Sequence, residues 1–154
     1  MKDHYKKIFL YEKWANLQVA DALLSIPDIP EKPLSLLSHI INAQKIWLGR
    51  IKNENPNTQV WQIYDRTEIK DKINHSSSGL LEFIESISGN DIKKMISYKN
   101  TRGDKFTTAI EDMLIHLTHH SAYHRGQIVL LIKDMIPVLP GTDYIIFERT
   151  NGLK

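Results

Sequence analysis

Histidines at metal-binding spacing are the most chemically informative residues of this sequence. His120 and His124 lie four residues apart, so on a helix their rings point the same way and can share one ion. A single helix rarely supplies more than two such ligands, and His39 is the best-placed candidate for a third. The chain has no cysteine, so imidazoles and carboxylates must carry any metal chemistry. We therefore predict an open metal site formed by three histidines from two helices.

A packing role is the alternative interpretation of these histidines. A lone histidine at the edge of an apolar core is more often a hydrogen-bonded packing residue than a ligand. The pair at i,i+4 and a third ring on another helix favour the metal site, although spacing alone does not decide between the two. Asp112 and Asp134 lie too far along their helix to join the site, whereas Glu12 stays open as a fourth ligand.

The length and charge of the chain restrict its class. The 154 residues suit a single domain, residues 1–154. Twenty Lys and Arg against eighteen Asp and Glu give a net charge of +2, and scattered basic residues argue against nucleic-acid binding. No window approaches the roughly 20 apolar residues that span a bilayer, and no apolar stretch suits a signal peptide. We expect a cytoplasmic protein that binds neither nucleic acid nor membrane.

Apolar residues recur at helical spacing in four segments, which predicts an all-α, up-down four-helix bundle. Asp3 is the expected cap of the first helix, and Thr108 begins a capping-box pattern for the last. A short β-hairpin is expected between the third and fourth helices, around an Asn/Gly turn in 95–108. The helices are expected at about 3–25, 33–53, 65–89 and 108–137.

The helical angles place the histidines at the edge of the core. On the last helix Ile110, Leu117, Ser121 and Ile128 mark the inward face, which Met113, Leu114, Leu131 and Met135 extend. By the same count His120 and His124 border this face, His116 lies further out on the same row, and His119 faces solvent. On the second helix His39 shares an edge row with Arg50. Arg50 and Arg125 can bind an anionic substrate, although solvated helix faces often carry such residues.

The chain resembles the DinB-like (YfiT/DinB) superfamily of four-helix-bundle metalloproteins. The likeness lies in segments that follow one another along nearly the whole chain, and the run Tyr123-His124-Arg125-Gly126-Gln127 with the later Pro140-Gly141-Thr142-Asp143-Tyr144 is its most specific part. The earlier segments are Tyr11–Asn16 and His39–Arg50. One departure is His119, where the family more often has asparagine; this position faces away from the expected site.

The resemblance implies a divalent ion, zinc or nickel in related proteins, bound by His39, His120 and His124. It also implies a homodimer and a short carboxy-terminal segment packed back on the bundle. Members of the superfamily include thiol-dependent S-transferases and an isomerase, which suggests a small-molecule substrate and a low-molecular-weight thiol as cosubstrate. His116, Tyr123, Arg50 and Gln127 are the candidates for orienting ligands or transferring protons around the ion.

Three functions remain open from the sequence. Three neutral imidazoles leave the ion its full charge and a free coordination position, as in catalytic zinc sites. A thiol there favours transfer to an electrophile, and a water favours hydrolysis. The third possibility is a non-catalytic, dimeric, metal-binding bundle with a stress-related role. Because imidazoles must be neutral to bind, the ion should leave as pH falls below about 6.

Overall fold

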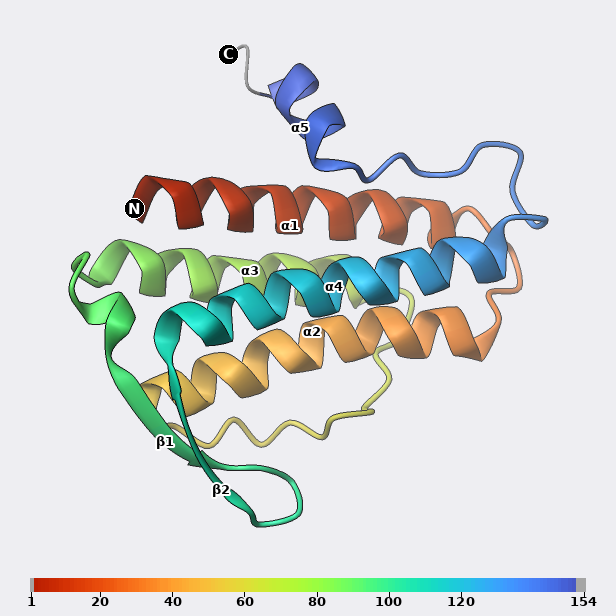
Figure 1. Cartoon of the computed structure of the whole chain (residues 1–154). Coiled ribbons are helices and arrows are strands. Elements are labelled where there is room, and N and C mark those ends of the chain that lie inside the picture. Colours follow the sequence, from red (N-terminus) through yellow and green to blue (C-terminus); the bar gives the residue numbers. More distant parts are fainter. Residues whose placement is uncertain (1, 152–154) are drawn as a thin grey trace.

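The computed structural model describes residues 2–151, and four long helices account for most of them (Figure 1). A two-stranded antiparallel hairpin lies between the third and fourth helices, with Met95 opposite Ala109 and Lys99 opposite Lys105. The predicted all-α bundle with its hairpin is confirmed. The elements are α1 Lys2–Leu24, α2 Glu31–Lys52, α3 Ile69–Ser86, the 3-10 turn η1 Asp91–Lys93, β1 Met95–Lys99, β2 Lys105–Ala109, α4 Ile110–Ile132 and α5 Tyr144–Asn151.

The helices pack in an order that differs from their order in the chain. α1 packs mainly on α3 and α2 mainly on α4, while α1 and α2, although consecutive, make few contacts. The helix directions run up, down, down, up rather than alternating as expected, because segment 53–68 returns along the bundle before α3 begins (Figure 1). This topology places the facing sides of α2 and α4 next to each other, and these two helices carry the predicted histidines.

Segment 53–68 turns back sharply from the end of α2. Asn53 is in the left-handed region at φ 56°, a conformation that asparagine tolerates better than most residues. Gly49 permits the close approach that follows, since a Cβ there would lie 2.4 Å from Cδ of Pro56. The segment therefore runs along the outside of α2 toward His39.

The core is formed by the inward faces of all four helices. The predicted inward residues Ile110, Leu117, Ser121 and Ile128 of α4 are all buried, and His119 is exposed as expected. The buried apolar residues form two clusters, one around α1, α2 and the end of α4, the other around α3 and the start of α4. The predicted row of core residues on α4 is therefore correct over most of its length.

Several expected helix ends are wrong. Thr108 does not cap α4: it belongs to β2, and Ala109 precedes the helix without any side-chain cap. Leu131 and Met135 are exposed rather than buried: Leu131 although it lies within α4, and Met135 beyond the end of the helix at Ile132. α1 has already begun at Lys2, which places Asp3 in its first turn. α3 begins at Ile69 and ends at Ser86, inside the expected range.

The carboxy-terminal segment packs back on the bundle, as the resemblance implied. The Tyr11 hydroxyl of α1 donates a hydrogen bond to the Thr142 carbonyl at 2.8 Å. Phe147 of α5 is buried against the rings of Tyr11 and Trp14.

No helix within residues 2–151 is both long and apolar enough to cross a membrane.

Candidate metal site

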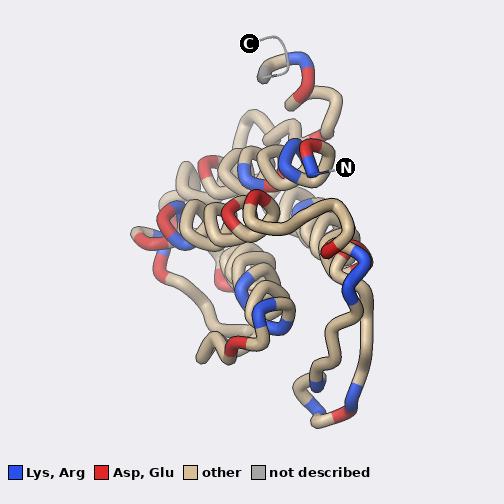
Figure 2. The backbone as a smooth tube through the Cα atoms, turned by 90° about the vertical axis from the view of Figure 1, so that its left-hand side faces the viewer, with Lys and Arg blue, Asp and Glu red and all other residues tan. Residues whose placement is uncertain are grey.

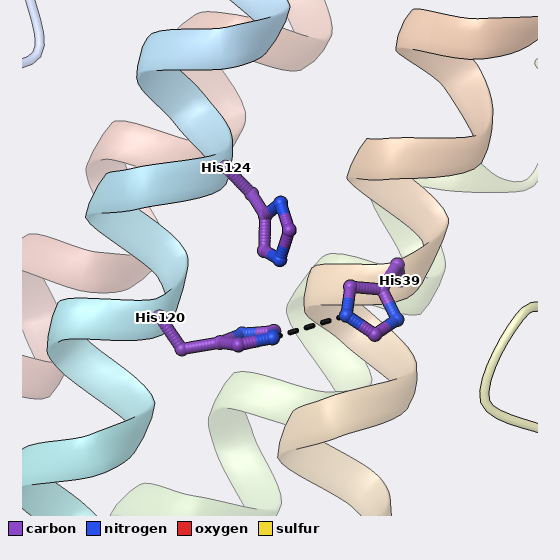
Figure 3. Close-up of side chains that lie close together, drawn as sticks. All are labelled: His39, His120 and His124. Carbon is purple, nitrogen blue, oxygen red and sulfur yellow. Dashed lines mark hydrogen bonds between the residues drawn. The ribbon is translucent and has the colours of Figure 1, made fainter.

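Three histidines from α2 and α4 converge at one point between the helices. One ring nitrogen each from His39, His120 and His124 lies within 4.8 Å of the other two. Figure 3 shows the three rings facing a common space, with Nε2 of His39 3.0 Å from Nε2 of His120. The structure thus brings together the three residues that the sequence suggested as ligands.

His39 is held in the tautomer that a metal ligand requires. Its Nδ1 lies 3.0 Å from the carbonyl oxygen of Val60, which can only accept, so the ring proton resides on Nδ1. Nε2 of a neutral ring is then unprotonated and faces the other two histidines. A histidine whose second nitrogen donates to a carbonyl is the usual arrangement around protein-bound metals.

His124 has a comparable partner on its own helix. Its Nδ1 lies 2.7 Å from Oε1 of Gln127, three residues further along α4. An amide oxygen only accepts hydrogen bonds, so it holds the His124 proton on Nδ1 and leaves Nε2 free to bind. Gln127 therefore contacts the site, as the sequence suggested.

His120 contacts the rings of both other histidines and has the most perturbed pKa of the three. Burial, and then the neighbouring His124, His39 and His116, lower its pKa to about 3. Burial likewise lowers the pKa of His39, against the opposing hydrogen bond to Val60. Both rings are therefore neutral at pH 7, the form that binds metal. Nδ1 of His120 is buried and has no hydrogen-bond partner among the described residues.

Two nitrogens of this donor set have the spacing that an ion of zinc's size requires, and the third lies within 4.8 Å of both. Two nitrogens at about 2.0–2.1 Å from a tetrahedral zinc are about 3.3 Å apart, close to the 3.0 Å between His39 and His120. Without an ion, Nε2 of His120 has to donate to the bare Nε2 of His39, and Nδ1 of His120 is left as a buried acceptor without a donor. The unprotonated nitrogens thus meet where a cation would stabilise them.

An exposed tryptophan covers one face of the site. The Trp61 ring stacks on the His39 imidazole, with the centroids 4.0 Å apart and the planes at 10°. Asn42 holds this part of segment 53–68, because its amide donates to the carbonyls of Gln62 at 2.7 Å and of Val60 at 3.3 Å. Sequence reasoning gave Asn42 no role; its position three residues after His39, on the same helix face, was the available signal.

The other suggested residues lie at increasing distance from the three histidines. The ring centroid of His116 lies 5.4 Å from that of His120 and 5.0 Å from that of Trp47. Tyr123 is 65% exposed and its ring meets His124 edge-on. Arg50 does not contact the histidine cluster; its guanidinium lies over Trp47. The structure therefore places His116, Tyr123 and Gln127 beside the cluster. Arg50 lies further away, beyond Trp47.

Arg125 and Glu12 form a buried ion pair, which corrects two expectations. Arg125 donates to both carboxylate oxygens of Glu12, at 2.8 and 2.9 Å, and also to Asn16 at 3.0 Å. Burial lowers the pKa of Arg125, but the hydrogen bond and charge of Glu12 outweigh it and the pKa is raised. Glu12 is therefore engaged away from the metal site, and Arg125 is neither solvated nor free to bind a substrate.

Comparison with known proteins gives two matches. The sequence model of the DinB family matches residues 31–152. Protein DinB of Bacillus subtilis (strain 168) is 22% identical over 162 aligned positions, which cover 94% of this chain and 93% of that protein. No solved structure matched the chain.

Proposed function

The chain belongs to the DinB family, and on this basis we propose that it is an enzyme that binds one divalent metal ion through His39, His120 and His124. The observation that carries the proposal is the convergence of three ring nitrogens within 4.8 Å. Zinc and nickel are the proposed ions because the resemblance implies them; imidazole ligands suit copper and iron as well. Three neutral ligands leave the ion's charge undiminished, which suits catalysis better than a closed structural site.

We propose that the reaction transfers a low-molecular-weight thiol to an electrophilic small molecule. When bound, a divalent ion lowers the pKa of a thiol at its open position. The absence of cysteine means that the thiol must come from outside the chain. In the transfer the S–H bond breaks, a bond from sulfur to the electrophilic carbon forms, and the leaving group departs with its electron pair.

The protein's own residues would position the reactants and accept the thiol proton. Val60 and Gln127 hold the protons of His39 and His124 on Nδ1, so that Nε2 of each ring stays available. His116 is the proposed proton acceptor, because burial and then the nearby Arg50 lower its pKa and keep a ring nitrogen unprotonated at neutral pH. Trp61 shields one face of His39 from water.

Metal analysis followed by thiol assays tests this function. Untagged protein purified without chelator should contain about one zinc or nickel per chain, and His124→Ala should lose most of it, while the exposed His119→Ala should not. A supplied thiol should disappear only when an electrophile and the metal-loaded protein are both present. If the protein is purified without metal and cannot be loaded with it, the enzyme proposal is rejected and the non-catalytic bundle is favoured.

Hydrolysis is the second candidate, because the same open position can activate water. An ester or amide panel without any thiol distinguishes the two reactions. Thiol-independent turnover that is lost in His124→Ala would replace the transferase proposal with a hydrolase.

A further inference from the structure

Arg50 is a half-buried cation without an anionic partner. Its guanidinium carbon lies 4.4 Å from the Trp47 centroid and 4.9 Å from the Tyr98 centroid. Its side chain makes no hydrogen bond or ion pair with any of residues 2–151. By contrast, Arg125 is paired with Glu12, and Arg66 donates to the Pro27 carbonyl at 2.8 Å. A guanidinium that is partly shielded from water and has no acidic partner can bind an anion from outside the chain.

A groove of about 870 Å³ opens beside this arginine. It lies between the end of α2 and the hairpin, and Lys99, Lys105 and Phe106 line it together with Arg50 and Tyr98. Lys99 and Lys105 are opposite each other in the strand register, so two further cations stand at the same end of the hairpin (Figure 2). Glu54 is the single carboxylate of the lining, which leaves the groove with an excess of positive charge.

The groove is connected to the histidine site by a row of ring contacts. The ring centroids of His120 and His116 are 5.4 Å apart, and those of His116 and Trp47 are 5.0 Å apart. The Arg50 guanidinium lies over the Trp47 ring. The side chains that border the groove and those of the histidine site are therefore in contact along one side of the bundle.

We propose that this groove binds a carboxylate of the thiol reactant, with Arg50 as the anion-binding residue. Trp47 and Tyr98 hold the plane of the guanidinium, and its N–H edge can then take a carboxylate through two parallel hydrogen bonds. Lys99 and Lys105 add attraction at the rim. Small cellular thiols built from cysteine commonly carry such carboxylates. The statement that the bound acid is a reactant rests on the proposed transfer reaction. The statement that the groove binds a carboxylate does not depend on that reaction.

Titration calorimetry on metal-free protein tests the groove separately from the metal. The ligand is S-methylglutathione, whose sulfur is blocked and whose two carboxylates are free, and the matched ligand is its diethyl ester. The acid should bind, and the ester should bind weaker by about tenfold or more, because it lacks the charged acceptors. Arg50→Gln should abolish this preference, Arg50→Lys should keep part of it, and raised salt should weaken it.

Two further variants keep the test decisive. Arg102→Gln, at an exposed arginine in the hairpin turn outside the groove lining, should bind the acid like the wild type. The exposed double variant Lys99→Gln, Lys105→Gln should reduce the affinity less than Arg50→Gln, without affecting the core. Absence of saturable binding to the wild type, equal affinity for acid and ester, or a preference that persists in Arg50→Gln would overturn the proposal.

A zinc titration of the same metal-free preparations separates the two hypotheses. Zinc binding without any carboxylate preference would reject the groove and leave the metal site in place. A carboxylate preference that depends on Arg50, in protein that binds no metal and consumes no thiol, would support the groove and reject the proposed reaction.

Discussion

Burial controls the protonation of His39 and His120. Isolated imidazoles protonate near pH 6.5, and protons would then displace a bound ion below about pH 6. Within the protein, burial lowers the pKa of His39, and burial with the three neighbouring rings lowers that of His120 to about 3. Protons therefore compete with a metal ion only at lower pH than the isolated side chains would suggest.

The first prediction concerns metal retention as the pH falls. Because the pKa values of His39 and His120 are lowered and these two rings stay neutral, we expect half-release of zinc at a pH below the value of about 6 that isolated imidazoles would give. Dialysis from pH 7 to pH 4 followed by elemental analysis measures this, with His119→Ala as the control at an exposed histidine. Complete release at pH 6.5 would contradict the predicted effect of burial.

A second prediction concerns the buried pair of Arg125 and Glu12. Glu12→Ala leaves the guanidinium in the core without its carboxylate, which should destabilise the protein by about 3–5 kcal/mol. Glu82→Ala, at an exposed residue of α3, should change stability by less than about 0.5 kcal/mol. Urea unfolding measures both. A small effect of Glu12→Ala would mean that water or another acceptor satisfies Arg125.

At the scale of elements, segment 53–68 completes one side of the site. Its return along α2 brings the Val60 carbonyl to Nδ1 of His39 and Trp61 onto the ring of the same histidine. Asn42 holds the segment there through two main-chain carbonyls. The orientation of one histidine thus depends on a loop that is distant from it in the sequence.

The third prediction is that Asn42→Ala loosens this segment and weakens metal binding. Loss of both amide donors should speed amide exchange around residues 60–62 and weaken zinc affinity by about 10–100-fold, as is typical of residues that support ligands. Hydrogen exchange and a competitive zinc titration measure the two effects. Asn57→Ala, at an exposed asparagine of the same segment, is the matched control and should change neither. Unchanged affinity in Asn42→Ala would remove the segment from the metal site.

At the scale of the molecule, α4 exposes an apolar face that none of residues 2–151 covers. Ile115 is 42% and Leu130 64% exposed, and they lie on one side of the helix with Ala122 and Gly126 between them. A Cβ at Gly126 would meet nothing within 4 Å, so the fold of the single chain does not require this glycine. Small residues between large apolar ones permit another helix to approach closely. We propose that a second copy of the chain covers this face.

The fourth prediction is a homodimer that depends on this face. Light scattering at micromolar concentration should give twice the chain mass for the wild type, and Leu130→Glu should shift the protein toward the monomer by placing a charge in the interface. Met95→Glu, at an exposed apolar residue of the hairpin, is the control and should leave the dimer intact. A monomeric wild type would reject the proposal, and an intact Leu130→Glu dimer would place the interface elsewhere.

The sequence by itself determined the elements and the histidine faces. Helical periodicity depends on local spacing, so four helices, a hairpin and the edge position of His120 and His124 followed from the order of residues. The ends of α4 did not follow, because strand pairing overrode the capping pattern at Thr108 and the chain left the helix after Ile132.

Only the tertiary structure decided which groups meet across elements. The contact between His39 and His120, the pairing of Arg125 with Glu12 and the stacking of Trp61 on His39 each join residues far apart in the chain. Spacing along one helix fixes a side chain's direction, but its partner depends on how helices pack and where a loop returns. For that reason the free guanidinium of Arg50 and the bound one of Arg125 were indistinguishable in the sequence and differ in the folded protein.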